Sequence, residues 1–364
     1  MTNRPIEPVV VEARSGENVP GEGNGSPLGG RRAPGGMDLH RIGHEAARLL
    51  PLAQKVLEHY PFKVREVEHL ATHSNVMYRV ITSDGFQCVL RVGSAGTNAR
   101  ANIDYEVAWL SALNRDTDLE IVTPIKTGYG TLIVDAQEPD SDQTRPCVLF
   151  SWIPGAPLAD GAGSFGYRLL GRVSASLQEH GRTWQVPNPD GMRRWDRIFY
   201  YDSHLDPVII ESPRFDHLFD SYRRRTISKA SELSERVIKD AWVTGFPHVV
   251  HGDLHEWNVH LIRSRLHAFD FEDVMIATPG QDVSVCLYSS RASDRREEIR
   301  SAYRQGYEEI APWPIEDMEQ LDGFHAARQI MLMNYAARTL PMGEAEEYLT
   351  QVTPWLQRYV DHYG

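Results

Sequence analysis

One β-rich segment, residues 249–271, interrupts the helical pattern of the second half of the chain and places polar side chains at its turns. It reads His251-Gly252-Asp253-Leu254-His255-Glu256-Trp257-Asn258, then two short apolar strands, then Phe269-Asp270-Phe271. Asp253 and Asn258 lie five residues apart on a tight loop, and Asp270 follows the second strand. Because short strands hold both ends of such a loop, we expect the three side chains to face one cavity.

The oxygens of these three side chains suit a hard cation. Mg²⁺ takes one or two carboxylates together with water and phosphate oxygens. The spacing, His-x-Asp followed by four residues and Asn with a second Asp on the next hairpin, matches the catalytic loop of kinases. In that arrangement Asp253 orients the acceptor hydroxyl and takes its proton, while Asn258 and Asp270 hold the metal against the nucleotide phosphates. The pattern predicts phosphoryl transfer.

Two other interpretations of the segment are open from the residues alone. Asp and Asn also occur simply because they form loops. His255, together with His248, His251 and His260, supplies ligands of the kind that zinc hydrolases use. The zinc interpretation leaves the first half of the chain unexplained, so we favour the kinase-like site.

The segment resembles the aminoglycoside phosphotransferase and choline kinase-like superfamily, a branch of the protein-kinase-like fold. The likeness is strongest in residues 251–259 and in Ala268-Phe269-Asp270-Phe271-Glu272-Asp273, and it extends over about residues 60–340. It implies an α+β, bilobal fold with a small antiparallel-sheet N-lobe and a mainly helical C-lobe. It also implies ATP as co-substrate and Mg²⁺ as cofactor.

Five residues of the first lobe resemble the nucleotide-binding positions of this family. Asn75 stands in the loop over the phosphates, Arg91 on the third strand and Glu106 on the helix that pairs with it, and Phe150 and Trp152 stand in the hinge that would hold the adenine. The family usually has Lys where this chain has Arg91, and Arg grips phosphate through two N–H groups. An ordinary surface ion pair between Arg91 and Glu106 is the alternative.

Three further features of the motifs bear on the resemblance. The phosphate loop lacks a glycine pair, and Glu256 stands where many relatives carry Pro. Asp282, in Gln281-Asp282-Val283, resembles the residue that braces the catalytic loop. Glu272 and Asp273 fit further ligands and a solvated acidic turn equally well.

Hydrophobic periodicity divides the chain into three parts. Residues 1–36 are rich in Gly and Pro and predict a disordered tail, residues 37–153 a nucleotide-binding N-lobe, and residues 154–364 a C-lobe that binds metal and acceptor. Strands are expected at 62–70, 76–82, 87–92, 121–125, 131–134 and 147–152. Helices are expected at 39–60, 101–113, 165–178, 215–242, 281–290, 295–310, 317–339 and 344–362.

Charge and cysteine content narrow the partners. The formal net charge of −12 argues against nucleic acid and suits a cationic small molecule. The three cysteines are odd in number and widely spaced, which favours reduced thiols in the cytoplasm. The sequence offers neither an apolar run long enough to span a membrane nor a secretory signal.

These observations predict a phosphotransferase that moves the γ-phosphate of ATP, or of GTP, to a hydroxyl of a small molecule, with an amino sugar or aminoglycoside-like acceptor favoured. Two alternatives remain open: a protein Ser/Thr kinase of the stress-response type and a nucleotide-binding pseudokinase regulator. The sequence does not indicate an oligomeric state.

Overall fold

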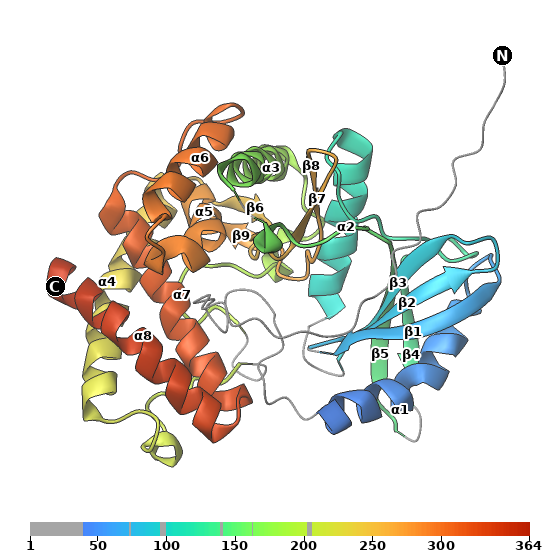
Figure 1. Ribbon diagram of the computed structural model, residues 1–364, viewed down its shortest axis with the longest axis horizontal. Helices are drawn as coiled ribbons and strands as arrows, with labels where there is room; N and C mark the ends of the chain where they lie inside the picture. The colour runs from blue at the N-terminus through green and yellow to red at the C-terminus, as the bar shows by residue number, and fades with distance from the viewer. Residues whose placement is uncertain (1–38, 73, 95–99, 139–140, 162, 202–205) are drawn as a thin grey trace, which may run out of the picture.

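The protein folds into one part built on a sheet and a second part built mainly of helices (Figure 1). The computed structural model describes residues 39–72, 74–94, 100–138, 141–161, 163–201 and 206–364. The predicted tail, residues 1–36, lies outside the described residues. The α+β fold class and its arrangement in two lobes are confirmed, while the division at residue 153 stays a prediction.

The first part contains a five-stranded antiparallel sheet with the strand order β1-β2-β3-β5-β4. Its strands are β1 (Val64–Thr72), β2 (Val76–Thr82), β3 (Gln87–Val92), β4 (Ile133–Gln137) and β5 (Thr144–Ser151). The central strand β3 pairs Arg91 with Met77 of β2 on one side and with Val148 of β5 on the other. Arg91 is therefore fixed from both sides in the middle of the sheet.

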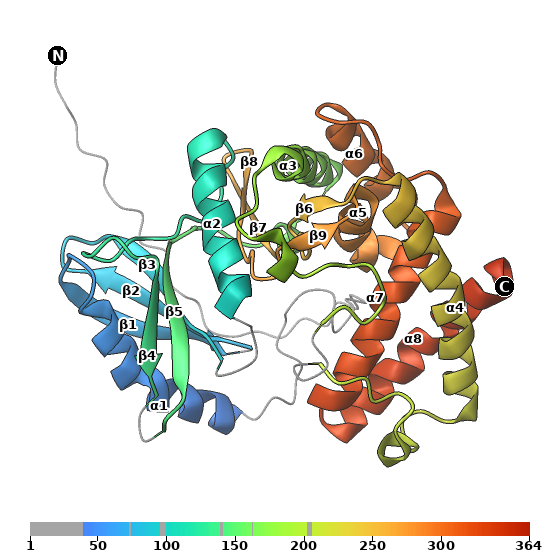
Figure 2. The same cartoon turned by 180° about the vertical axis from the view of Figure 1, so that it is seen from behind.

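Alternation along β3 sends its side chains to two different faces. Leu90 packs on the face that α1 (Leu39–Leu57) covers, whereas Arg91 reaches α2 (Arg100–Asp116) on the other face. Figure 2 shows α1 on the outer side of the sheet and α2 between the sheet and the helical part. The face that carries Arg91 thus looks toward the second part of the molecule.

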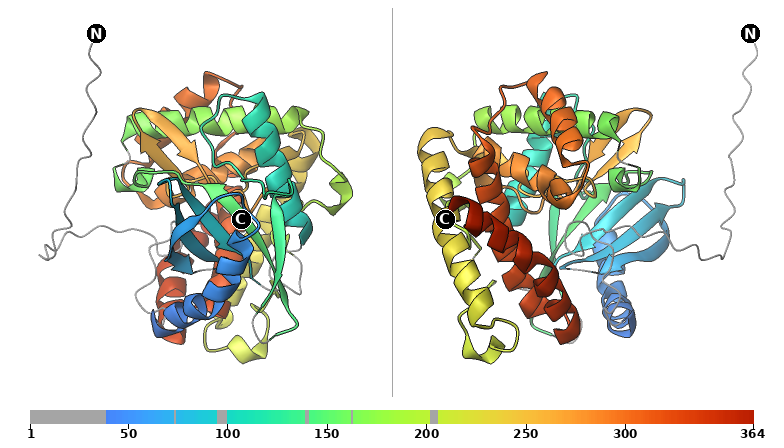
Figure 3. Two further views of the ribbon diagram at one scale, coloured as in Figure 1. Left: turned by 90° about the vertical axis from the view of Figure 1, so that its right-hand side faces the viewer. Right: turned by 60° about the vertical axis from the view of Figure 1, so that its left-hand side comes forward.

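Six helices and two small two-stranded sheets make up most of the described second part. The helices are α3 (Ser164–Thr183), α4 (Ser221–Thr244), α5 (Pro279–Tyr288), α6 (Arg296–Glu308), α7 (Met318–Thr339) and α8 (Met342–Tyr363). β6 (His248–Val250) pairs with β9 (Met275–Ala277), and β7 (Val259–Ile262) pairs with β8 (Arg265–Ala268), both antiparallel. Figure 3 shows α4 and α8 side by side, away from the sheet. None of the described helices has the length and apolar character that crossing a membrane requires.

Helices α3 and α6 approach each other at two glycines. A Cβ on Gly306 would lie 1.8 Å from the carbonyl oxygen of Arg168, and one on Gly171 would lie 2.0 Å from that of Tyr303. Both obstacles are backbone atoms, which cannot rotate away. The absence of side chains at these positions therefore sets the spacing of the two helices.

Most predicted elements are confirmed, and β2 and β3 have the predicted bounds. The predicted strand at residues 121–125 is wrong: Ile121 forms a single bridge to Ala268, and Pro124 a single bridge to Phe150. The segment touches one strand of each part in turn, and Pro124 has no N–H with which to continue a ladder. The helix predicted from residue 215 begins at Ser221 instead, where Asp220 accepts a hydrogen bond from the Arg223 N–H (2.7 Å) and caps it.

We expect Gly306→Ala to lower the free energy of unfolding by about 2–4 kcal/mol, because the added methyl group forces α3 and α6 apart. Gly343→Ala is the matched control, since Gly343 lies in α8 with open space around its missing Cβ. That variant should be neutral or more stable by up to about 1 kcal/mol. Urea unfolding of both variants measures the difference, and equal stabilities would contradict the close-packing argument.

Candidate active site

The buried carboxylate of Asp282 holds the loop between β6 and β7 in place. Asp282, in the first turn of α5, accepts a hydrogen bond from the Gly252 N–H (2.9 Å) and another from Gln178 Nε2 (2.9 Å). Gly252 has φ +81°, and a Cβ there would lie 2.3 Å from the carbonyl oxygen of Asp273. The chain can therefore turn at this point only with glycine. Asp282 occupies the bracing position that the resemblance implied.

His251 connects this loop to the segment that carries Asp270. Its Nε2 donates to the Phe269 carbonyl (3.2 Å), and its Nδ1 accepts from the Asp253 N–H (3.3 Å). Burial lowers the pKa of His251, so the ring is neutral, as this pair of contacts requires. His251 thus sets the distance between the two segments that hold Asp253 and Asp270.

Asp253 is surrounded by nitrogen donors. Its Oδ1 accepts from Arg328 of α7 (2.6 Å), and its Oδ2 lies 3.2 Å from Asn258 Nδ2 and 3.4 Å from His255 Nε2. Burial raises the pKa of a carboxyl group, but contact with His255 and Arg328 outweighs it and holds the pKa of Asp253 well below its ordinary value. The carboxylate is therefore ionised at neutral pH, and its side chain remains one-fifth exposed.

Asn258 and Asp270 are neighbours through the backbone. The Asn258 carbonyl accepts from the Phe269 N–H (3.1 Å), which puts Asp270 one residue beyond that bond. Asn258 directs its amide nitrogen to Asp253, to the backbone oxygen (2.9 Å) as well as to Oδ2, so its Oδ1 is the atom left to meet a cation. Asp270 has φ +65°, a left-handed conformation that ends the strand direction at this residue.

The Asn258 Oδ1 atom and the Asp270 carboxylate are suitable ligands for a divalent cation. An amide oxygen and a carboxylate on adjacent segments are ligands that Mg²⁺ accepts. Two of the four histidines considered for zinc are engaged with the backbone: His251 uses both ring nitrogens in this way, and His255 Nδ1 accepts from the Trp257 N–H (3.2 Å). No group of three His, Cys, Asp or Glu residues in the described part of the chain is arranged to hold a metal ion. The donor set favours magnesium over zinc.

A buried ion pair joins the sheet to α2. Arg91 Nη1 donates to Glu106 Oε1 (2.9 Å) and Nη2 donates to Oε2, and the two residues are 6% and 1% exposed. The alternative of an ordinary surface pair is therefore wrong. Burial alone would lower the pKa of Arg91, but Glu106, Glu272 and Asp270 raise it above its ordinary value. The charges of Glu272 and Asp270, both in the second part, thus act on Arg91 in the first.

Glu272 belongs to the second part, and its side chain contacts residues of the first part. Its carboxylate accepts from Asn75 Nδ2 (2.6 Å) and from Ser74 Oγ (3.4 Å), and it lies 3.8 Å from Arg91 Nη1. Its side chain is only 12% exposed, so the interpretation as a solvated acidic turn is wrong for Glu272. Asn75 and Arg91 thus share the Glu272 carboxylate.

The two hinge aromatics differ in their surroundings. Phe150 is buried and lies under the Arg91 guanidinium, with 5.1 Å between the guanidinium carbon and the ring centre. Trp152 is half-buried and carries Arg79 on its ring at 4.9 Å. Phe150 therefore supports the ion pair directly, and Trp152 is the more accessible of the two flat surfaces.

Arg328 is a site residue that the sequence analysis missed. It lies in the run Ala326-Ala327-Arg328-Gln329-Ile330 of α7, among buried positions. A charge inside such a run has to be paired, which was the available signal. The helical period could not show that the partner is Asp253, 75 residues earlier. Arg193, which pairs with Asp273 (2.7 Å), was missed as well.

The sequence matches the Phosphotransferase enzyme family over residues 66–324. Among curated proteins, an uncharacterized protein of Synechocystis sp. is 23% identical over 259 residues, which cover 70% of this chain and 69% of that protein. A microcompartment-associated aminopropanol kinase has a similar structure, with a TM-score of 0.72, 23% identity, and coverage of 86% of this chain and 98% of that one. An amicoumacin kinase in complex with AMP-PNP and Ca²⁺ has a TM-score of 0.69 at 16% identity, with coverage of 89% and 96%.

We expect Arg328→Met to lower the free energy of unfolding by about 2 kcal/mol at pH 7, because it leaves the Asp253 carboxylate without its closest cation. A carboxyl whose pKa is lowered by folding stabilises the protein above its ordinary pKa of 3.8 and loses that effect as the pH falls. The difference from the unsubstituted protein should therefore be full at pH 5 and above and shrink as the pH falls below 3.8. Urea unfolding at these pH values measures it.

Arg65→Met is the matched control for this experiment. Arg65 lies exposed on β1, and the substitution changes the charge by the same amount. A loss of stability equal to that of Arg328→Met, or one that does not depend on pH, would contradict the pairing argument.

Proposed function

Since the chain belongs to the Phosphotransferase enzyme family, we propose that it transfers the γ-phosphate of ATP to a hydroxyl group of a small molecule that also carries an amine. The observation that supports this most directly is the joined pair Asp253 and Asn258 opposite the Arg91–Glu106 ion pair. A base and a metal ligand then lie in the second part of the molecule, and a cation for phosphate lies in the first.

Asp253 is the proposed base. It accepts the proton of the acceptor hydroxyl while the hydroxyl oxygen forms a bond to the γ-phosphorus and the bond to the bridging oxygen of ADP breaks. Because the carboxylate is fixed by Asn258, His255 and Arg328, its main effect is to orient the hydroxyl. Orientation of this kind lowers the entropic cost of the reaction step.

The proposed nucleotide site uses residues of both parts. Arg91, held by Glu106 and Phe150, binds phosphate oxygens, and Asn75 binds them from the adjacent loop once it leaves Glu272. Trp152 offers its half-buried ring at the hinge for the adenine. Asn258 and Asp270 are the residues that would hold Mg²⁺, which neutralises phosphate charge when it is bound.

Two observations support an amine-bearing acceptor. One solved structure similar to this chain is an aminopropanol kinase, whose named substrate has both an amine and a hydroxyl. The net charge of −12 attracts cations toward the molecule. An amino sugar or aminoglycoside-like compound belongs to the same class.

A cytoplasmic location is part of the proposal. Cys88, Cys147 and Cys286 are all buried and unpaired. Burial raises the pKa of the Cys88 and Cys147 thiols to about 12, so both are protonated and inert at neutral pH. These properties suit a reducing compartment.

Incubation with labelled ATP or GTP and Mg²⁺ tests the acceptor class. The panel contains 1-amino-2-propanol, amino sugars, an aminoglycoside, the amine-free analogues of each, and a generic protein acceptor. We expect label in an amine-bearing small molecule and at least about tenfold less in its amine-free analogue. Label in the protein acceptor would support a protein kinase instead, and a nucleotide-dependent melting shift without turnover would support a pseudokinase.

The two proposed aspartates should fail in different ways. Asp253→Asn is expected to lower kcat by about 10²-fold or more with nucleotide affinity retained, because the base is lost and the phosphate contacts remain. Asp270→Asn is expected to abolish metal-dependent nucleotide binding, measured by calorimetry with AMP-PNP and Mg²⁺. The exposed Asp118→Asn is the control and should change neither quantity. Full activity in both site variants would rule out this assignment.

A further inference from the structure

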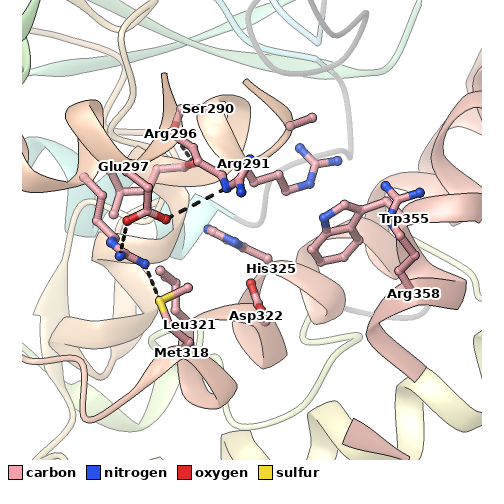
Figure 4. Close-up of a pocket in the computed structure, with 13 residues that line it drawn as sticks. Ser290, Arg291, Arg296, Glu297, Met318, Leu321, Asp322, His325, Trp355 and Arg358 are labelled. Carbon is pink, nitrogen blue, oxygen red and sulfur yellow. Dashed lines mark hydrogen bonds and ion pairs between the residues drawn. The ribbon is translucent and has the colours of Figure 1, made fainter. Parts of the chain in front are cut away.

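A cavity of about 380 Å³ is lined in part by the first half of α7 (Figure 4). Its lining comes from the end of α5, the short helix η4 (Ser289–Ala292), α6, α7 and α8. The loops that hold Asp253, Asn258 and Asp270 do not contribute to it. The cavity is therefore separate from the candidate active site, and nothing in the proposed function uses it.

Arginine dominates the charged lining of this cavity. The charged residues are Arg291, Arg296, Arg300, Arg358, Glu297 and Asp322. Glu297 is shared by Arg300 and Arg296, and Asp322 accepts from the Tyr363 hydroxyl (3.0 Å). In the described part of the chain, neither Arg291 nor Arg358 has an ion pair with a carboxylate. The cations exceed the anions by two, although the whole chain is acidic.

Arg291 is held in place without being neutralised. Its Nη1 donates to the Tyr288 carbonyl (2.8 Å), and its Nη2 donates to Gln329 Oε1, both of which are uncharged. The guanidinium lies over the rings of Tyr288 (3.7 Å) and Trp355 (5.2 Å). Its Nε is buried and has no hydrogen-bond partner among the described residues. Such a cation is already oriented for an anion, so little side-chain entropy is lost on binding.

His325 contributes an unused acceptor to the same cavity. It is 3% exposed, and its Nε2 donates to the Ser284 carbonyl (3.1 Å). Burial, with Arg291 as the next cause, lowers the pKa of His325 to about 3, so the ring is neutral and Nδ1 carries a lone pair. Within the described residues, this buried Nδ1 has no partner. A buried acceptor of this kind is free to take a donor from a ligand.

We propose that the cavity binds a small phosphomonoester. The dianionic phosphate would lie among Arg291, Arg296 and Arg358, and a hydroxyl or amine of the ester would donate to His325 Nδ1. Arginine guanidinium groups bind phosphate through paired N–H donors, and a dianion matches the excess of two positive charges. A monocarboxylate would leave one of these charges uncompensated. The half-buried Trp355 ring supplies a flat apolar wall for the organic part of the ester.

Calorimetric titration of the full chain with phenyl phosphate, which has a phosphate and a flat ring but no donor for His325, tests the phosphate and ring contacts on which the proposal depends. AMP-PNP and Mg²⁺ are present in excess, so that phosphate-binding groups in the proposed nucleotide site are occupied. Arg296→Gln combined with Arg358→Gln removes two cavity charges at exposed positions, where folding should be unaffected. Arg65→Gln combined with Arg225→Gln is the matched control, because both residues are exposed, lie outside the cavity and change the net charge equally.

We expect phenyl phosphate to bind the unsubstituted protein and the control variant with the same Kd within about twofold. The cavity variant should bind at least about tenfold more weakly, and benzoate should bind the unsubstituted protein at least about tenfold more weakly than phenyl phosphate does. Equal affinities for the cavity and control variants, equal affinities for the two ligands, or no binding of phenyl phosphate would each overturn the proposal. None of these measurements uses turnover, so the outcome is independent of the proposed phosphotransfer.

Discussion

The geometry of the candidate active site depends on one buried carboxylate, Asp282. It receives the Gly252 N–H and the side chain of Gln178, and it lies in the first turn of α5, whose positive dipole end favours a negative charge. With Gly252 fixed, the next residue, Asp253, has a defined direction, and His251 sets its distance from Phe269. Both segments that carry the candidate base and metal ligands are thus positioned by hydrogen bonds to backbone atoms, which do not adjust as side chains do.

Paired charges then connect the two parts of the molecule. Arg91 and Glu106 are buried together, and Glu272 reaches Arg91 and Asn75 from the second part of the molecule. A buried charge without a partner is costly, so each of these residues fixes where the others can lie. Glu272 occupies donors that the proposed nucleotide phosphates require. Binding of a nucleotide would exchange one anion for another, and Arg91 would have an anionic partner at every stage.

Much of this arrangement could be predicted from the sequence. The remainder could not, because it depends on contacts that form only after folding. Strand β2 and the loop around Asp253 are local patterns, in which the spacing of residues along the chain carries the information. The family and the fold class followed from them and are confirmed. Arg328 and the contact of Glu272 with Asn75 depend on which surfaces meet after folding, and periodicity does not record that. The strand predicted at residues 121–125 was wrong for the same reason. Its composition is typical of a strand, but after folding the segment forms only single bridges to two different strands.

The environment of Asp253 also constrains how the proposed reaction can work. Contact with Arg328 and His255 keeps its pKa well below the ordinary value, so the carboxylate has little tendency to take a proton from an alcohol in the ground state. Phosphoryl transfer tolerates this, because its loose transition state develops little need for an anionic nucleophile before the leaving group departs. Asp253 is then more effective as a fixed acceptor that aims the hydroxyl, and the proton moves only as the new bond forms. An arginine that makes the base weaker also makes its position more exact, and in this reaction position is the larger contribution.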